Sequence, residues 1–229
     1  MPPVTGRLRV GVLVSGSGTN LQALIDLCAM PGFPAEIVVV ISNKPDVLAL
    51  ERAARGGIAC RVIAHRAYPD RPSFDGALDQ ALREHEVELV CLAGFMRVLT
   101  TAFVELWRDR LINIHPSLLP AFRGLHTHAQ ALTAGVRFSG CTVHFVRPEL
   151  DDGPIIVQAV VPVLPGDDEV GLAARVQAAE HRAYPLALRL IAERRIRLID
   201  DRVEVLDPVA EVPALLNPPD LPTHPPPGR

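Results

Sequence analysis

Five short apolar runs, separated by segments of helical character, constrain the fold of this chain more than any other feature. The runs span residues 8–14, 36–41, 60–63, 89–93 and 111–114, and they are rich in Val, Ile and Leu. Strands buried on both faces of a parallel sheet have this composition. The intervening segments 21–28, 47–55, 74–85 and 98–107 are expected to form helices, with Asp46 capping the second. We therefore predict an α/β fold with a Rossmann-like, doubly wound, mostly parallel sheet in the amino-terminal half.

The carboxy-terminal half has a different pattern. Residues 140–146 and 155–163 have the composition of strands, and the short turn-forming link 147–154 favours an antiparallel pair. A long helix is expected over 169–192 and a hairpin over 197–205. The prolines that crowd residues 207–229 predict an extended or disordered tail.

Composition argues against several classes of function. The 23 basic and 26 acidic residues give a net charge of −3, with no basic excess to attract nucleic acid. The four cysteines are scattered without a CxxC pair, so we expect small buried hydrophobes and no zinc site. His126 and His128 form a His-x-His pair, which without further ligands is weak evidence for a metal. No stretch has the length of a membrane span or the pattern of a signal peptide, and we expect a soluble, cytoplasmic protein without a membrane partner.

A glycine-rich turn joins the first predicted strand to the first predicted helix. It reads Ser15-Gly16-Ser17-Gly18-Thr19-Asn20 and matches neither the dinucleotide nor the Walker pattern. Backbone N–H groups at such a turn, together with the positive end of the helix, bind phosphate. The alternative is a turn that only lets the helix pack closely against the strand.

The fifth strand ends in Asn113-Ile114-His115, followed by a loop that contains Pro116 and Pro120. Alternate residues of a strand point to the same side, so Asn113 and His115 are expected to share one crevice. Polar or glycine residues also follow three other strands, and all four strand ends should open onto one edge of the sheet, where such folds bind ligands. The alternative is a hydrogen-bonded core histidine and a turn-forming asparagine.

Asp151 lies in the link between the two carboxy-terminal strands and could reach the same crevice. An Asn, a His and an Asp beside a phosphate loop suit acyl or formyl transfer to an amine. The carbonyl oxygen becomes an oxyanion that amide and imidazolium groups stabilise. A neighbouring carboxylate fixes the imidazole tautomer and favours its charged form. Asp151 alone would have been interpreted as a turn residue.

The chain resembles the phosphoribosylglycinamide formyltransferases, a family of folate-dependent enzymes of purine synthesis. Five ordered motifs carry this resemblance, which runs in register from about residue 8 to 199: residues 12–22, 93–99, 113–120, 124–128 and 142–154. The resemblance implies a single domain over residues 1–206, with a nucleotide-binding half at about 8–112 and a folate-binding, catalytic half at about 113–206. It also implies a monomer or homodimer that acts on small-molecule substrates.

The resemblance further implies that the amine of glycinamide ribonucleotide attacks the formyl carbon of 10-formyltetrahydrofolate, without a metal. Asn113 would bind the formyl oxygen, His115 would be the general acid, and Asp151 would hold His115. Gly18, Thr19 and Asn20 would hold the phosphate and Glu180 the ribose hydroxyls. The folate pocket would be lined by Arg71, Phe95, Met96, Arg97, Val98, Leu99, Asn113 and Val146. Asp152 departs from the family pattern, which puts the placement of Asp151 in question.

Two other interpretations remain. A related formyltransferase could act on methionyl-tRNA or a sugar nucleotide with the same Asn, His and Asp. The tRNA enzyme needs a further carboxy-terminal domain and a basic face, and this chain has neither the length nor the charge for them. A non-catalytic nucleotide-binding module would be expected to lose Asn113, His115 or Asp151, and all three are present.

Overall fold

The computed structural model describes residues 6–206 and 215–217. Its elements in chain order are β1 (Leu8–Val14), α1 (Thr19–Cys28), β2 (Ala35–Ser42), α2 (Leu48–Arg55), β3 (Ala59–Val62), a 3₁₀ turn η1 (His65–Ala67), α3 (Arg71–Glu84), β4 (Leu89–Leu92), α4 (Thr101–Leu106), β5 (Leu111–His115), α5 (Thr127–Thr133), β6 (Phe138–Phe145), β7 (Ile155–Pro162), α6 (Glu169–Ala192), β8 (Ile196–Ile199) and β9 (Arg202–Val205). The prediction of a tail over 207–229 falls mainly outside the described residues.

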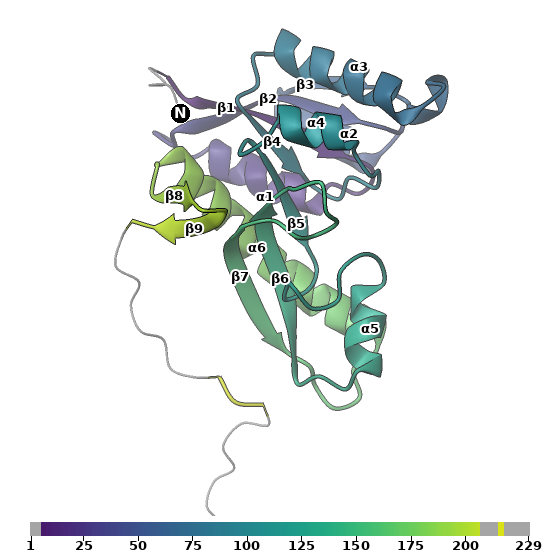
Figure 1. The fold of residues 1–229 in the computed structure, drawn as a ribbon, viewed down its shortest axis with the longest axis vertical. Helices are drawn as coiled ribbons and strands as arrows, with labels where there is room; N and C mark the ends of the chain where they lie inside the picture. Colours follow the sequence, from purple (N-terminus) through teal and green to yellow (C-terminus); the bar gives the residue numbers. More distant parts are fainter. Residues whose placement is uncertain (1–5, 207–214, 218–229) are drawn as a thin grey trace, which may run out of the picture.

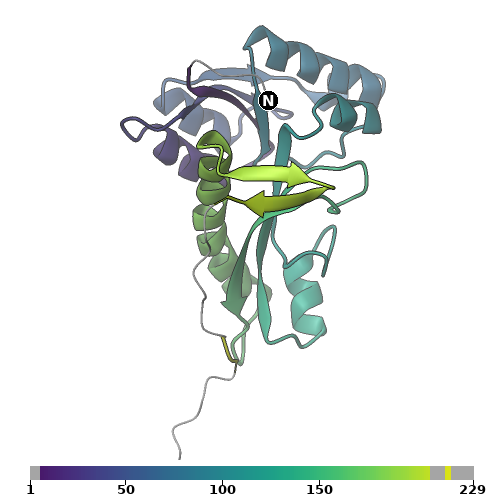
Figure 2. The same cartoon turned by 60° about the vertical axis from the view of Figure 1, so that its left-hand side comes forward.

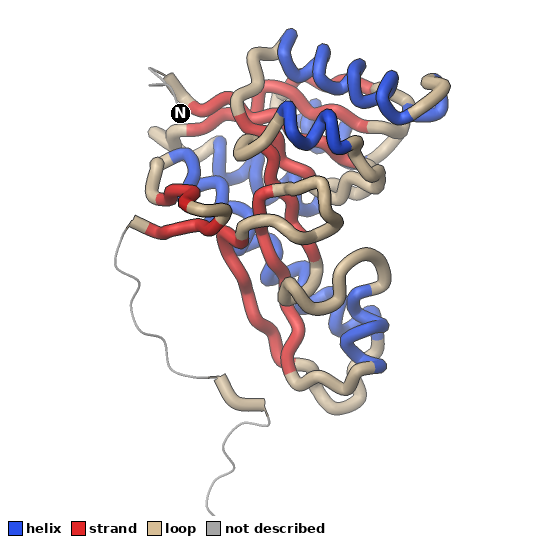
Figure 3. The backbone as a smooth tube through the Cα atoms, viewed as in Figure 1, coloured by secondary structure: helices blue, strands red, loops and turns tan. Residues whose placement is uncertain are grey.

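A seven-stranded sheet in the order β3-β2-β1-β4-β5-β6-β7 forms the centre of the molecule (Figures 1 and 3). The first five of these strands pair in parallel, whereas β6 pairs antiparallel with β5 and with β7. A separate antiparallel hairpin, β8–β9, follows α6. The predicted fold class is confirmed, including the change from parallel to antiparallel pairing after β5.

Helices cover both faces of the sheet, as a doubly wound fold requires. Leu21 and Leu24 of α1 join buried residues of α2 and α6 in one apolar cluster, whereas Leu78 of α3 and Trp107 belong to the cluster on the other face. The long helix α6 packs against β6 and β7 as well as α1. Tyr184, in the middle of α6, is fully buried, and its hydroxyl donates to the Leu92 carbonyl at 3.0 Å.

Two local expectations are wrong. Asp46 does not cap α2, because its φ of 52° is left-handed and Val47 occupies the N-cap position without a side-chain hydrogen bond. An N-cap residue normally has extended backbone geometry. Cys60 is exposed, unlike the other three cysteines, because β3 is the edge strand of the sheet.

Residues 98–107 contain a helix as expected, and it begins at Thr101. The Thr100 hydroxyl accepts a hydrogen bond from the Phe103 N–H at 3.3 Å and so caps α4. Residues 95–99 consequently remain a loop between β4 and α4. Residues 95–99 therefore lie at the carboxyl end of β4, next to the edge of the sheet where the other strand ends meet.

Asp168 provides a test of how α6 is stabilised. Its carboxylate accepts a hydrogen bond from the Gly171 N–H at 2.8 Å and caps the helix. Replacing Asp168 with Ala should lower the free energy of unfolding by about 1 kcal/mol, measured by urea denaturation. The matched variant Asp168→Asn keeps a capping oxygen and should lose less. Equal losses in both variants would show that the cap contributes little.

Candidate active site

The carboxyl ends of β1, β2 and β4 are tied together by buried polar groups. The Ser15 hydroxyl donates to Asn43 Oδ1 at 2.6 Å and accepts from the Met96 N–H at 2.8 Å. Asn43 also contacts His65 of η1, with its Nδ2 at 3.3 Å from His65 Nδ1. These contacts fix the start of the 95–99 loop relative to the glycine-rich turn.

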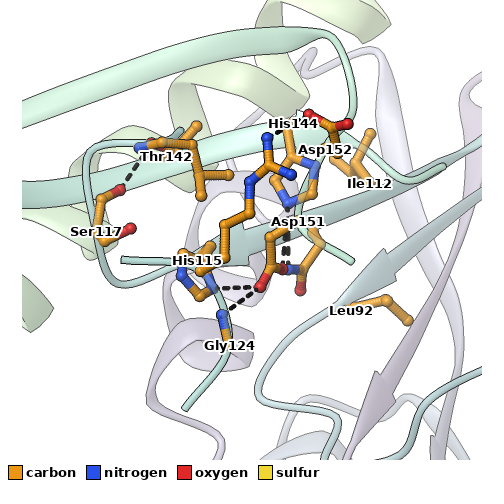
Figure 4. A network of polar contacts seen from close by, with 12 residues as sticks. Leu92, Ile112, His115, Ser117, Gly124, Thr142, His144, Asp151 and Asp152 are labelled. Atoms are coloured by element: carbon orange, nitrogen blue, oxygen red, sulfur yellow. Dashed lines mark hydrogen bonds and ion pairs between the residues drawn. The ribbon is translucent and has the colours of Figure 1, made fainter. Parts of the chain in front are cut away.

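His115 is the last residue of β5 and is 5% exposed. Its Nδ1 lies 3.4 Å from Asp151 Oδ2 (Figure 4). Its Nε2 lies 2.9 Å from the Phe122 carbonyl oxygen. Both ring nitrogens therefore face oxygen acceptors, an arrangement in which a protonated imidazole donates on both sides. The two ring nitrogens thus have different partners: Nε2 contacts the Phe122 carbonyl and Nδ1 faces the Asp151 carboxylate.

Asp151 reaches His115 from the loop between β6 and β7. Its backbone is left-handed, with a φ of 50°, and its Oδ2 accepts a hydrogen bond from the Gly124 N–H at 2.9 Å. The side chain is 9% exposed. One carboxylate oxygen thus faces both the imidazole and a backbone donor from the loop after β5.

Asn113 is positioned by a histidine on the neighbouring strand β6. In the antiparallel pairing of β5 with β6, Asn113 lies opposite His144, and its Nδ2 is 3.4 Å from His144 Nε2. His144 Nδ1 is 3.0 Å from the Phe145 carbonyl and donates to it, which leaves Nε2 as the acceptor for the amide. The second N–H of the Asn113 amide remains for a ligand. The signal in the sequence was a histidine alternating with apolar residues in a strand.

Burial lowers the pKa of His144, although the Phe145 carbonyl and the Asp151 carboxylate partly oppose that shift. The imidazole is 2% exposed. His144 Nε2 is also 4.0 Å from Asp151 Oδ1, so the two histidines lie on either side of the carboxylate. The lowered pKa keeps His144 neutral and therefore able to accept from Asn113.

Thr142 holds the loop that supplies Phe122 and Gly124. Its hydroxyl donates to the Ser117 carbonyl at 2.7 Å and accepts from the Leu119 N–H at 3.0 Å. Thr142 is fully buried and lies opposite His115 in the β5–β6 pairing. Sequence reasoning missed this role, and the only signal was a threonine facing the same side of the strand as His144.

The glycine-rich turn brings together the predicted phosphate and ribose residues. Gly18 has a φ of 71° at the N-cap of α1, and a Cβ there would lie 2.7 Å from Ala49. Asn20 Nδ2 donates to Glu180 Oε2 of α6 at 2.9 Å, and Thr19 Oγ1 accepts from Gln177 at 3.2 Å. Burial raises the pKa of Glu180, which the Asn20 hydrogen bond partly offsets. The Asn20 Oδ1 atom is buried without a hydrogen-bond partner.

The predicted folate residues lie on and around the 95–99 loop. Phe95 stacks on Phe74 of α3, with ring centroids 6.4 Å apart, and Leu99 and Val146 pack on the same apolar cluster. Met96 and Val98 are 64% and 60% exposed. Arg97 is half-buried, and Arg71 is exposed at the first turn of α3. Exposed apolar side chains next to polar strand ends are a feature of surfaces that bind other molecules.

Within the described residues, no three His, Cys, Asp or Glu side chains are grouped to hold a metal ion. His126 and His128 stand at the start of α5 and belong to no such group there. No helix in residues 6–206 is long and apolar enough to cross a membrane.

Comparison with known proteins identifies the family. The family model for formyl transferases matches residues 8–188. The chain is 46% identical to phosphoribosylglycinamide formyltransferase of Escherichia coli, over 83% of this chain and 90% of that protein. This chain belongs to the formyl transferase family. The motif-based resemblance is thereby confirmed.

Two further relatives support the assignment to this family. Glycinamide ribonucleotide transformylase 1 of Symbiobacterium toebii is 49% identical, with a TM-score of 0.86 over 90% of this chain and 98% of that one. The trifunctional purine biosynthetic protein adenosine-3 of Drosophila pseudoobscura is 56% identical over 85% of this chain. The chain spans only 14% of that trifunctional protein. The similarity therefore concerns one part of the larger relative.

Because His144 is buried and neutral, this formyl transferase should lose stability in acid. The unfolded chain takes up a proton as the pH falls through about 6.5, whereas folded His144 resists protonation, so the free energy of unfolding should decrease. Replacing His144 with Asn should make that decrease smaller, by at most about 1.4 kcal/mol per pH unit. Urea denaturation between about pH 7.5 and about pH 5.5 measures it. The control His126→Asn removes an exposed imidazole, and equal pH slopes for both variants would contradict the assignment.

Proposed function

We propose that this chain transfers the formyl group of 10-formyltetrahydrofolate to the amine of glycinamide ribonucleotide, in the cytoplasm, as a monomer or homodimer. The observation that carries the proposal is the 3.4 Å contact between His115 Nδ1 and Asp151 Oδ2, beside Asn113. The relatives that share this family and nearly all of their length with the chain are named for that reaction.

In this proposal, Asn113 and His115 stabilise the charge that develops on the formyl oxygen during attack by the amine. The free N–H of Asn113 donates to that oxygen, because the other is directed at His144. His115 lies beside Asn113, and its imidazolium, with Nδ1 facing Asp151 and Nε2 facing the Phe122 carbonyl, stabilises the developing negative charge electrostatically. Asp151 stabilises the imidazolium and accepts the proton that leaves the amine. The bond between the formyl carbon and N10 of the folate then breaks, and N10 takes up a proton, so that tetrahydrofolate leaves. No side-chain nucleophile is required, because the amine attacks directly.

The glycine-rich turn is assigned to the acceptor and the 95–99 loop to the folate. The N–H groups at Gly18 to Asn20 begin α1, so they are available to a phosphate. The Glu180 carboxylate, 2.9 Å from Asn20, is assigned to the ribose hydroxyls. The exposed Met96 and Val98 side chains are assigned to the pterin ring.

Substitution of the catalytic groups tests the reaction. In His115→Ala and in Asp151→Asn, kcat for formyl transfer to glycinamide ribonucleotide, followed by absorbance, should fall roughly 10²-fold or more. Asp200→Asn is the matched control, because Asp200 also has a left-handed backbone, with a φ of 47° against 50° for Asp151. If the folded wild type binds the folate but transfers no formyl group, the acceptor is a different amine.

Glu180 tests the assignment of the acceptor site separately. In Glu180→Gln, the KM for glycinamide ribonucleotide should rise roughly 10-fold, because a neutral amide accepts more weakly from a ribose hydroxyl. The KM for 10-formyltetrahydrofolate should stay unchanged. Steady-state kinetics with each substrate varied in turn measures both constants. If only the KM for 10-formyltetrahydrofolate rises, Glu180 contacts the folate and not the ribose.

A further inference from the structure

The loop that presents Asp151 is held at its base by a buried cation. The Phe145 N–H donates to the Pro154 carbonyl at 2.9 Å, which closes the loop. Arg147 is 6% exposed, whereas Pro148, Glu149, Leu150 and Asp152 are all exposed. The loop therefore meets solvent along most of its length and is anchored inward by a guanidinium group. A buried guanidinium has to be paired with acceptors.

Two aspartates from distant segments provide that pairing. Arg147 Nε lies 2.9 Å from Asp201 Oδ1, and Arg147 Nη2 lies 2.8 Å from Asp109 Oδ1. Asp109 is in the turn before β5, and Asp201 is in the turn of the β8–β9 hairpin. Figure 2 shows this hairpin beside the β6–β7 pair. We call this set, Arg147 with Asp109 and Asp201, the arginine clamp.

The stem of Arg147 also borders the backbone next to Asp151. A Cβ added to Gly153 would lie 3.4 Å from Arg147 Cγ and 1.7 Å from the Phe145 carbonyl oxygen. The Gly153 backbone is thus seated against both groups, with no room for a side chain. The Arg147 stem therefore lies next to the chain two residues after the proposed catalytic carboxylate.

We propose that the arginine clamp positions Asp151 against His115, so that the carboxy-terminal hairpin takes part in catalysis through the loop backbone. This inference rests on the role proposed above for Asp151. The clamp fixes one side of the loop, and the Gly124 N–H fixes the carboxylate itself from the other side. Loosening the clamp would allow Asp151 to move away from the imidazole while the phosphate turn stayed in place.

The double variant Asp109→Asn/Asp201→Asn tests the clamp without forcing the backbone. Both residues have left-handed φ values, 61° and 58°, which asparagine tolerates. Hydrogen–deuterium exchange of the peptide over 146–154, measured without substrates, should become at least about 10-fold faster. The kcat for formyl transfer should fall roughly 10- to 10²-fold, with the KM for glycinamide ribonucleotide unchanged.

Two further variants separate positioning from general stability. Asp200→Asn removes the same charge from the same turn, where Asp200 makes no ion pair with any residue in 6–206, and it should alter neither exchange nor kcat. Arg147→Lys keeps a cation and should exchange more slowly than Arg147→Met, which keeps only the stem. Faster exchange with unchanged kcat in the double variant, or unchanged exchange, would overturn the proposal. If the wild type does not formylate glycinamide ribonucleotide, the proposed function fails, and the exchange contrast still decides whether the clamp holds the loop.

Discussion

The antiparallel pairing of β5 with β6 is the interaction on which the rest of the site depends. It sets Asn113 opposite His144 and His115 opposite Thr142. One of these pairs orients the amide, and the other supports the loop that meets the imidazole. A slip of β6 by one residue would turn His144 and Thr142 to the face of the sheet opposite Asn113 and His115. The candidate site therefore lies where the sheet changes from parallel to antiparallel pairing, at β5.

The backbone supplies a contact to each of His115 and Asp151. His115 Nε2 is held by the Phe122 carbonyl and Asp151 by the Gly124 N–H, both from the loop after β5. Backbone groups at these positions tolerate a range of side chains, provided the loop keeps its path. Buried Thr142 maintains that path through its contacts with Ser117 and Leu119. The geometry at His115 thus depends on Thr142, whose hydroxyl bonds to the loop and not to the imidazole.

Sequence reasoning could predict the features that local pattern encodes. Apolar runs indicated the strands, and the alternation of Asn113 with His115 placed both on one side of a strand end. It could not predict that His144 orients Asn113, because that contact depends on which residue lies opposite His144 in the β5–β6 pairing. Arg147 and Asp201 are 54 positions apart, and no local signal connects them. The predicted cap at Asp46 was wrong because the backbone there is left-handed. The predicted burial of Cys60 was wrong because Cys60 lies on the edge strand.

The two halves of the site differ in how their geometry is maintained. The glycine-rich turn is fixed by β1, α1 and the close approach of Gly18 to Ala49. The Asp151 carboxylate instead stands on a loop whose exposed residues outnumber its buried ones. Such a loop opens more readily than the core strands beneath it. Substitutions at the base of that loop should therefore change the rate of formyl transfer more than the affinity for the phosphate-bearing acceptor.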